Sequence, residues 1–125
     1  MSRALILLAH GARNPAWAAP FEAVVERIRA VQPALTVRLA FLELMPPDLT
    51  TVLHELAEAG TTDIEVMPMF LGGAGHVLRD VPPILEAVQA ERDLRIHMHP
   101  ALGQWAGMVE AMAAVCLSVL QGPRP

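Results

Sequence analysis

The sequence is poor in the residues that mark several classes of protein. It contains one cysteine, and its nine basic side chains, all arginine, are outnumbered by thirteen acidic ones. The net charge of −4 argues against a nucleic-acid-binding surface, which needs a basic patch. A single cysteine cannot form an internal disulfide. Because Cys116 lies in an apolar run, we predict a buried thiol in a reducing compartment.

Long apolar runs are also missing. No run approaches the roughly 20 residues that a membrane helix needs, and the apolar segment 4–9 is too short for the core of a signal peptide. No linker or low-complexity segment divides the chain, and 125 residues with 54% hydrophobic content fit one compact domain. We therefore expect a single domain over residues 1–125, in the cytoplasm and without a membrane partner.

Apolar segments alternate with amphipathic ones along the chain. We predict strands at residues 4–9, 36–42, 63–70 and 94–99, and helices at 17–31, from an N-cap at Asp48 to Gly60, at 81–91 and at about 105–120. The first of these strands is apolar without alternation, as in a parallel sheet that is covered on both faces. The order predicts an α/β fold: a small doubly wound domain with a four-stranded parallel sheet and helices on both faces.

Three side chains that can bind a metal ion or transfer a proton follow three of these strands. His10 ends the first strand, Glu43 ends the second, and His76 follows the third after a glycine-rich loop. If the strand order is 2-1-3-4, a crevice opens above the carboxyl ends of strands 1 and 3. The sequence therefore predicts that His10, Glu43 and His76 converge on one mouth of the sheet.

The glycine-rich loop is the most distinctive stretch of the chain. Gly72, Gly73 and Gly75 allow positive φ angles and a close approach of the backbone to a ligand. His76 stands where a helix is about to begin, which makes it a candidate for chemistry. The alternative is a helix-entry histidine without any chemical role.

Three blocks of sequence stand out together. They are Leu8-Ala9-His10-Gly11-Ala12-Arg13-Asn14-Pro15, Ala40-Phe41-Leu42-Glu43-Leu44, and Pro68-Met69-Phe70-Leu71 continued by Gly75-His76-Val77-Leu78-Arg79-Asp80-Val81-Pro82. In order and spacing they resemble the small CbiX-type class II tetrapyrrole chelatases, the sirohydrochlorin cobaltochelatases and ferrochelatases. The resemblance implies that His10 and His76 bind the incoming metal ion and that Glu43 assists. Residues 99–105 depart from the family pattern, so no contacts are assigned to that loop.

The resemblance implies an enzyme, a lyase that inserts Co²⁺ or Fe²⁺, with Ni²⁺ as a further candidate, into sirohydrochlorin. Neutral imidazoles bind these ions, and a histidine or carboxylate can accept the pyrrole protons. The metal is a substrate, and no permanently bound cofactor is expected. The tetrapyrrole carries many carboxylates, for which Arg13 and Arg79 are candidate partners, beside the backbone of Gly73 and Gly75. The physiological metal, and the choice between the cobalamin and siroheme pathways, stay open.

Two other functions use the same residues. A non-enzymatic metal-binding or delivery protein would need only the histidines. The other is a phosphohistidine phosphatase with His10 as its nucleophile. Such an enzyme has an arginine directly before the nucleophilic histidine, and Ala9 occupies that position here, which argues against this function.

The remaining histidines are weaker candidates for function. His54 is predicted to lie at the surface or boundary of the second helix. His97 and His99 alternate along the fourth strand and point to one face, a spacing that could bind metal, although a covering helix is the expected neighbour.

The last predicted helix, at about residues 105–120, is apolar nearly all round, and only Glu110 is charged. A helix of this kind needs cover on more than one side, and the exposed patch would be large for a monomer of this size. We therefore predict a homodimer.

Overall fold

The computed structural model describes residues 2–72 and 75–122, apart from the side chain of His76. Its centre is a parallel sheet with the strand order β2-β1-β3-β4, which confirms the predicted order. The strands are β1 (Arg3–Ala9), β2 (Thr36–Phe41), β3 (Asp63–Pro68) and β4 (Arg95–Met98). Because β1 is central, Leu8 pairs with Ala40 on one side and with Pro68 on the other.

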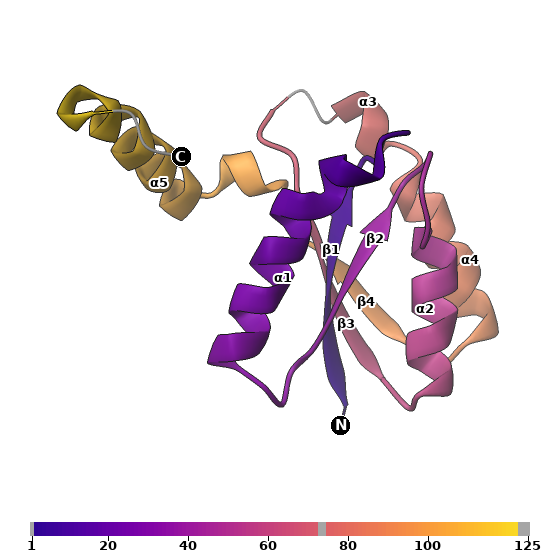
Figure 1. Cartoon of the computed structure of the whole chain (residues 1–125). Coiled ribbons are helices and arrows are strands. Elements are labelled where there is room, and N and C mark those ends of the chain that lie inside the picture. Colours follow the sequence, from indigo (N-terminus) through magenta and orange to yellow (C-terminus); the bar gives the residue numbers. More distant parts are fainter. Residues whose placement is uncertain (1, 73–74, 123–125) are drawn as a thin grey trace.

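The helices cover the two faces of the sheet unequally. Figure 1 shows α1 on one face and α2 with α4 on the other, while α5 projects away from the sheet. The helical segments in chain order are η1 (Pro15–Ala18), α1 (Ala19–Val31), α2 (Leu49–Glu58), α3 (Gly75–Leu78), α4 (Val81–Glu91), η2 (Leu102–Gln104), α5 (Ala106–Ser118) and η3 (Val119–Gln121). Within the described part of the chain, no helix combines the length and apolarity needed to cross a membrane.

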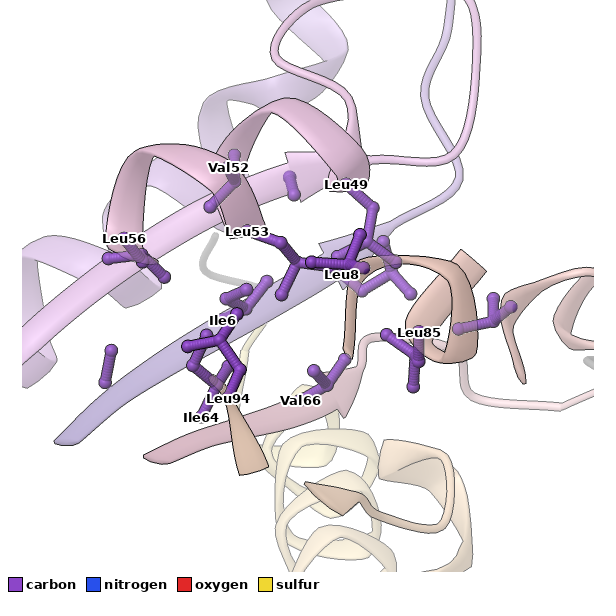
Figure 2. Packing of buried hydrophobic residues seen from close by; sticks show 14 residues of the cluster. Ile6, Leu8, Leu49, Val52, Leu53, Leu56, Ile64, Val66, Leu85 and Leu94 are labelled. Atoms are coloured by element: carbon purple, nitrogen blue, oxygen red, sulfur yellow. The ribbon is translucent and has the colours of Figure 1, made fainter. Parts of the chain in front are cut away.

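The larger part of the core lies between the sheet and the α2–α4 layer. In Figure 2, Leu49, Leu53 and Leu56 of α2 point onto the strands, where Ile6 and Val66 meet them. Ile6, Leu53 and Val66 are completely buried. A smaller cluster on the opposite face joins Leu7 and Val37 to Val25 of α1. Successive residues of β1 thus pack on opposite faces of the sheet, which explains why this central strand is apolar without alternation.

Several predicted boundaries need correction. The segment predicted as one helix at 17–31 begins as the 3₁₀ turn η1, with Pro20 at the start of α1. The third strand ends at Pro68 rather than at residue 70, and the short helix α3 was not predicted. Cys116 was expected to be buried and is exposed, because α5 stands clear of the sheet.

Asp48 begins α2 as predicted, because its carboxylate accepts the backbone N–H of Thr51 at 2.8 Å. We expect Asp48→Ala to lower the free energy of unfolding by about 1 kcal/mol, and Asp48→Asn to retain most of the cap. Hydrogen bonds from the hydroxyl and the backbone N–H of Thr51 hold the pKa of Asp48 below its usual range. The cap is therefore fully effective above about pH 4 and is lost as the pH falls through the lowered pKa of the folded state.

Urea unfolding of the three proteins at neutral and at acidic pH measures both effects. The difference between wild type and Asp48→Ala should shrink toward pH 2. A difference that is absent at neutral pH, or that does not change with pH, would contradict this role of Asp48.

Candidate functional site

The ends of β1 and β2 bring the first two predicted site residues together. The backbone pairing continues beyond the strands, since the N–H of Leu42 donates to Ala9 O at 3.0 Å and the N–H of Glu43 donates to His10 O at 3.1 Å. His10 Nε2 then lies 3.1 Å from Glu43 Oε1. The side chains are 40% and 58% exposed, so the pair faces an open rim rather than a closed cavity.

Gly11 allows this close pairing. Its φ of +102° is one that other residues rarely adopt, and a Cβ at this position would overlap the carbonyl oxygen of Glu43. The two chain segments can therefore approach only where residue 11 has no side chain. The proximity of Gly11 to His10 in the sequence was the only available hint of this role.

The third predicted residue follows the strand on the other side of β1. The N–H of Met69 donates to Leu8 O at 2.8 Å, so the chain leaving β3 still runs beside β1. It reaches α3, whose second residue is His76. The carboxyl ends of β2, β1 and β3 are thus neighbours, as predicted. The side chain of His76 and the whole of Gly73 lie outside the described residues.

The described side chains do not by themselves form a complete metal site. Among them, no group of three or more histidine, cysteine, aspartate and glutamate residues is placed to hold an ion. His10 and Glu43 supply two groups, one imidazole nitrogen and one carboxylate. Such a pair can hold a first-row divalent cation weakly or share a proton, and further ligands would have to complete the site.

The predicted substrate contacts lie in exposed loops on both sides of this rim. Arg13 follows Gly11 and makes no hydrogen bond or ion pair with any residue that the structure describes. Arg79 is exposed at the end of α3. Gly75 lines an open groove of about 440 Å³ together with Leu71, Gly72, Leu78, Met98, His99, Pro100, Ala101 and Gln104.

Two of the other histidines, His54 and His99, have side-chain partners. His54 Nδ1 accepts a hydrogen bond from Arg92 Nε at 3.2 Å, which agrees with a boundary position. His99 Nε2 lies 2.8 Å from Glu65 Oε1 on the α1 side of the sheet. His97 is exposed, so the helix expected to cover it is absent from the described chain. His99 also contributes to the groove beside the glycine loop, as noted above.

Two features of the loop after β2 were not apparent from the sequence. Leu44, next to Glu43, has a φ of +71°, a conformation that is strained for a branched side chain, and it is 52% exposed. The N–H of Ala12 approaches Met45 Sδ at 3.4 Å, which ties this loop to the one after β1. A glycine or asparagine would have been the usual signal for positive φ, and neither occurs at position 44.

Comparison with known proteins agrees with this architecture. A sirohydrochlorin cobaltochelatase from Methanopyrus kandleri is 33% identical over 82 residues, which cover 66% of this chain and 57% of the relative. The enzyme of the same name from Methanococcus aeolicus is 30% identical over 88 residues, covering 70% of this chain and 62% of the relative. The matched region thus spans less than two thirds of the length of these curated relatives.

Solved structures extend the similarity to the fold. A crystal structure described as a cobalamin (vitamin B12) biosynthesis CbiX protein from Marinobacter aquaeolei superposes with a TM-score of 0.84 and 27% identity, over 97% of this chain and 99% of the other. The sirohydrochlorin chelatase SirB from Bacillus subtilis, in complex with cobalt, gives a TM-score of 0.77 and 27% identity, over 95% of this chain and 51% of SirB. The CbiX family model matches residues 4–117, and the chain therefore belongs to the CbiX family.

Proposed function

We propose that this protein inserts Co²⁺ or Fe²⁺ into sirohydrochlorin. The observation that carries the proposal is the pair of His10 Nε2 and Glu43 Oε1, 3.1 Å apart on an open rim beside the strand that leads to His76. Relatives named sirohydrochlorin cobaltochelatase, and SirB structures with cobalt and with Fe³⁺, support the choice of reaction and metal. In this proposal His10 and His76 bind the metal ion, which is a substrate, and Glu43 assists.

The chemistry requires an exchange of protons for metal. Insertion of M²⁺ forms the metal–nitrogen bonds and releases two protons from the pyrrole N–H groups of the ring. A histidine can bind the ion only through an unprotonated nitrogen. In the free protein the 3.1 Å separation allows His10 and Glu43 to share a proton. A cation bound between them would replace this proton, and after delivery of the metal both groups are free to accept the pyrrole protons.

The open rim suits a large planar substrate. We assign Arg13 and Arg79 to carboxylates of the tetrapyrrole, because arginine forms paired charge-assisted hydrogen bonds with carboxylates. The backbone at Gly73 and Gly75 would allow the ring to approach closely. The metallated product fits a step in either cobalamin or siroheme biosynthesis.

The histidines are tested by His10→Ala and His76→Ala. We expect each to reduce the rate of insertion by roughly 100-fold or more, since each removes a metal ligand or proton acceptor. The rate is followed by the absorption change during anaerobic incubation with sirohydrochlorin and Co²⁺. The control is His97→Ala, which removes an exposed histidine away from the rim and should leave the rate unchanged.

The outcome separates metal insertion from metal delivery. The variant that carries both His10→Ala and His76→Ala is first shown to be folded by circular dichroism. If it still inserts Co²⁺ at the wild-type rate, after subtraction of the spontaneous reaction, the proposal is refuted. A wild-type protein that binds Co²⁺ through these histidines but neither binds nor metallates sirohydrochlorin would instead be a metal-delivery protein.

Gly11 offers a test of the pairing itself. We expect Gly11→Ala to reduce insertion strongly, because the new methyl group would push Glu43 away from His10. It should also lower stability, by about 1 kcal/mol or more for the unfavourable φ. Gly60→Ala is the matched control: Gly60 has a φ of +92°, yet a Cβ there meets nothing within 4 Å.

Gly60→Ala should therefore lose stability and keep the wild-type rate. Urea unfolding and the insertion assay measure the two effects separately. Equal rates for Gly11→Ala and Gly60→Ala would show that the His10–Glu43 distance does not matter for insertion.

A further inference from the structure

We propose that Leu44 and Leu71 bind the apolar ring of the tetrapyrrole above the pair of His10 and Glu43, with one leucine on each side. The inference rests on the proposed function, because it names two further contacts for the same substrate. Both leucines are large apolar side chains left in water: Leu44 is 52% exposed and Leu71 is 60% exposed. Single exposed leucines are common on protein surfaces, but these two flank one candidate site, and the first is held in a strained conformation.

Leu44 has an unfavourable backbone conformation that the core does not require. Its φ of +71° lies in the left-handed region, where glycine and asparagine are the usual residues. The neighbouring Leu42 and Met45 pack against buried clusters, whereas Leu44 belongs to none of the apolar clusters of the described chain. Glu43 and Leu44 line the same open hollow, of about 500 Å³, so a ligand that reaches the carboxylate also meets the leucine. Strained residues of this kind gather at ligand sites, and a ligand contact explains this one.

Leu71 stands in the corresponding place on the other side of β1. It is the third residue after the end of β3, as Leu44 is the third residue after the end of β2. The segment after β4 holds its backbone, because the N–H of Gly103 donates to Phe70 O at 2.9 Å and a Cβ on Gly103 would overlap the carbonyl of Leu71. Leu71 lines the open groove of about 440 Å³ that contains Gly75. The leucine is thus held in place without being buried.

The strand order places the two leucines on opposite sides of His10. β2 and β3 lie on either side of β1, and neighbouring strands are about 4.8 Å apart, so the loops that carry the leucines leave the sheet roughly 10 Å apart. Figure 1 shows the loops after β1 and β2 and the helix α3 at the same edge of the sheet. A macrocycle of four pyrrole rings is a flat body that can span this distance. The pair of leucines therefore fits such a ring better than it fits a small ion.

The chemistry of a tetrapyrrole explains why it needs apolar as well as charged contacts. Its carboxylates lie at the periphery, where Arg13 and Arg79 are proposed to bind them, whereas the macrocycle itself is apolar on both faces. A leucine that packs against one face removes apolar surface from water, which favours binding. The same contact exists before, during and after metal transfer, so the leucines support binding of the ring rather than the chemical step.

Leu44→Asn separates the ligand contact from the stability of the fold. Asparagine is close to leucine in size and tolerates positive φ, so the variant should unfold at the same or a higher urea concentration than the wild type. Because it removes the apolar surface, we expect the dissociation constant for metal-free sirohydrochlorin, measured by absorption titration, to rise at least about tenfold. The KM for sirohydrochlorin should rise in parallel, and kcat for Co²⁺ insertion should stay within about twofold of the wild type. Leu44→Met keeps an apolar side chain and should keep the affinity within about threefold.

Leu71→Asn should weaken tetrapyrrole binding in the same way, and Val31→Asn is the matched control. Val31 is the last residue of α1 and is 79% exposed. Figure 1 shows α1 running from the rim to the opposite end of the sheet. The control therefore also replaces an exposed apolar side chain by asparagine, and it should bind sirohydrochlorin with wild-type affinity.

The outcomes distinguish the role of the leucines from the proposed function itself. If the wild type binds and metallates sirohydrochlorin, and Leu44→Asn and Leu71→Asn bind it as tightly, the role of the leucines is overturned and the proposed function stands. If the wild type does not bind sirohydrochlorin, both are overturned. A Leu44→Asn variant that is markedly less stable than the wild type would show that this leucine supports the fold, which would overturn its assignment to the ligand.

Discussion

The parallel pairing of β1 with both β2 and β3 is the constraint on which the rest of this structure depends. Ala4, Ile6 and Leu8 of this central strand are completely buried, so helices must cover it. Parallel pairing also places the carboxyl ends of β2, β1 and β3 at one edge of the sheet. Segments that are more than thirty residues apart in sequence thereby meet at a single rim, and the side chains that follow these strands become neighbours.

The site also requires that the loops after β1 and β2 stay close together. Parallel strands bring two backbones to the usual spacing, but the pair of His10 and Glu43 also needs the two loops to stay together after the strands end. Gly11 permits this because the carbonyl of Glu43 occupies the space that a side chain would fill. The strained Leu44 lies in the loop after β2, and the contact of Ala12 with Met45 joins this loop to the one after β1. Rigid strands and tightly joined loops can hold a weakly bound ion in a defined place without burying it.

Much of the fold could be predicted because its signals are local or periodic. Apolar runs identify the strands, and Asp48 behind two prolines identifies the start of α2. The meeting of His10 with Glu43 followed from an assumed strand order that the structure confirms. The pairing of His99 with Glu65 depends on the register between two strands, and the positive φ of Leu44 depends on tertiary contacts, so neither leaves a local signal. The apolar sequence of α5 indicates that the helix needs cover but not which surface provides it, which is why the prediction of a buried Cys116 is wrong for the single chain.

The central claim is that strand order assembles a metal-binding rim from His10, Glu43 and His76. Crystals of the wild-type protein containing Co²⁺, measured near the cobalt absorption edge, test it most directly through the anomalous difference density. The account predicts a strong peak at metal–nitrogen bonding distance from imidazole nitrogens of both His10 and His76, with Glu43 beside it. A cobalt peak at His97 and His99 instead, with His10 still hydrogen-bonded to Glu43, would contradict it.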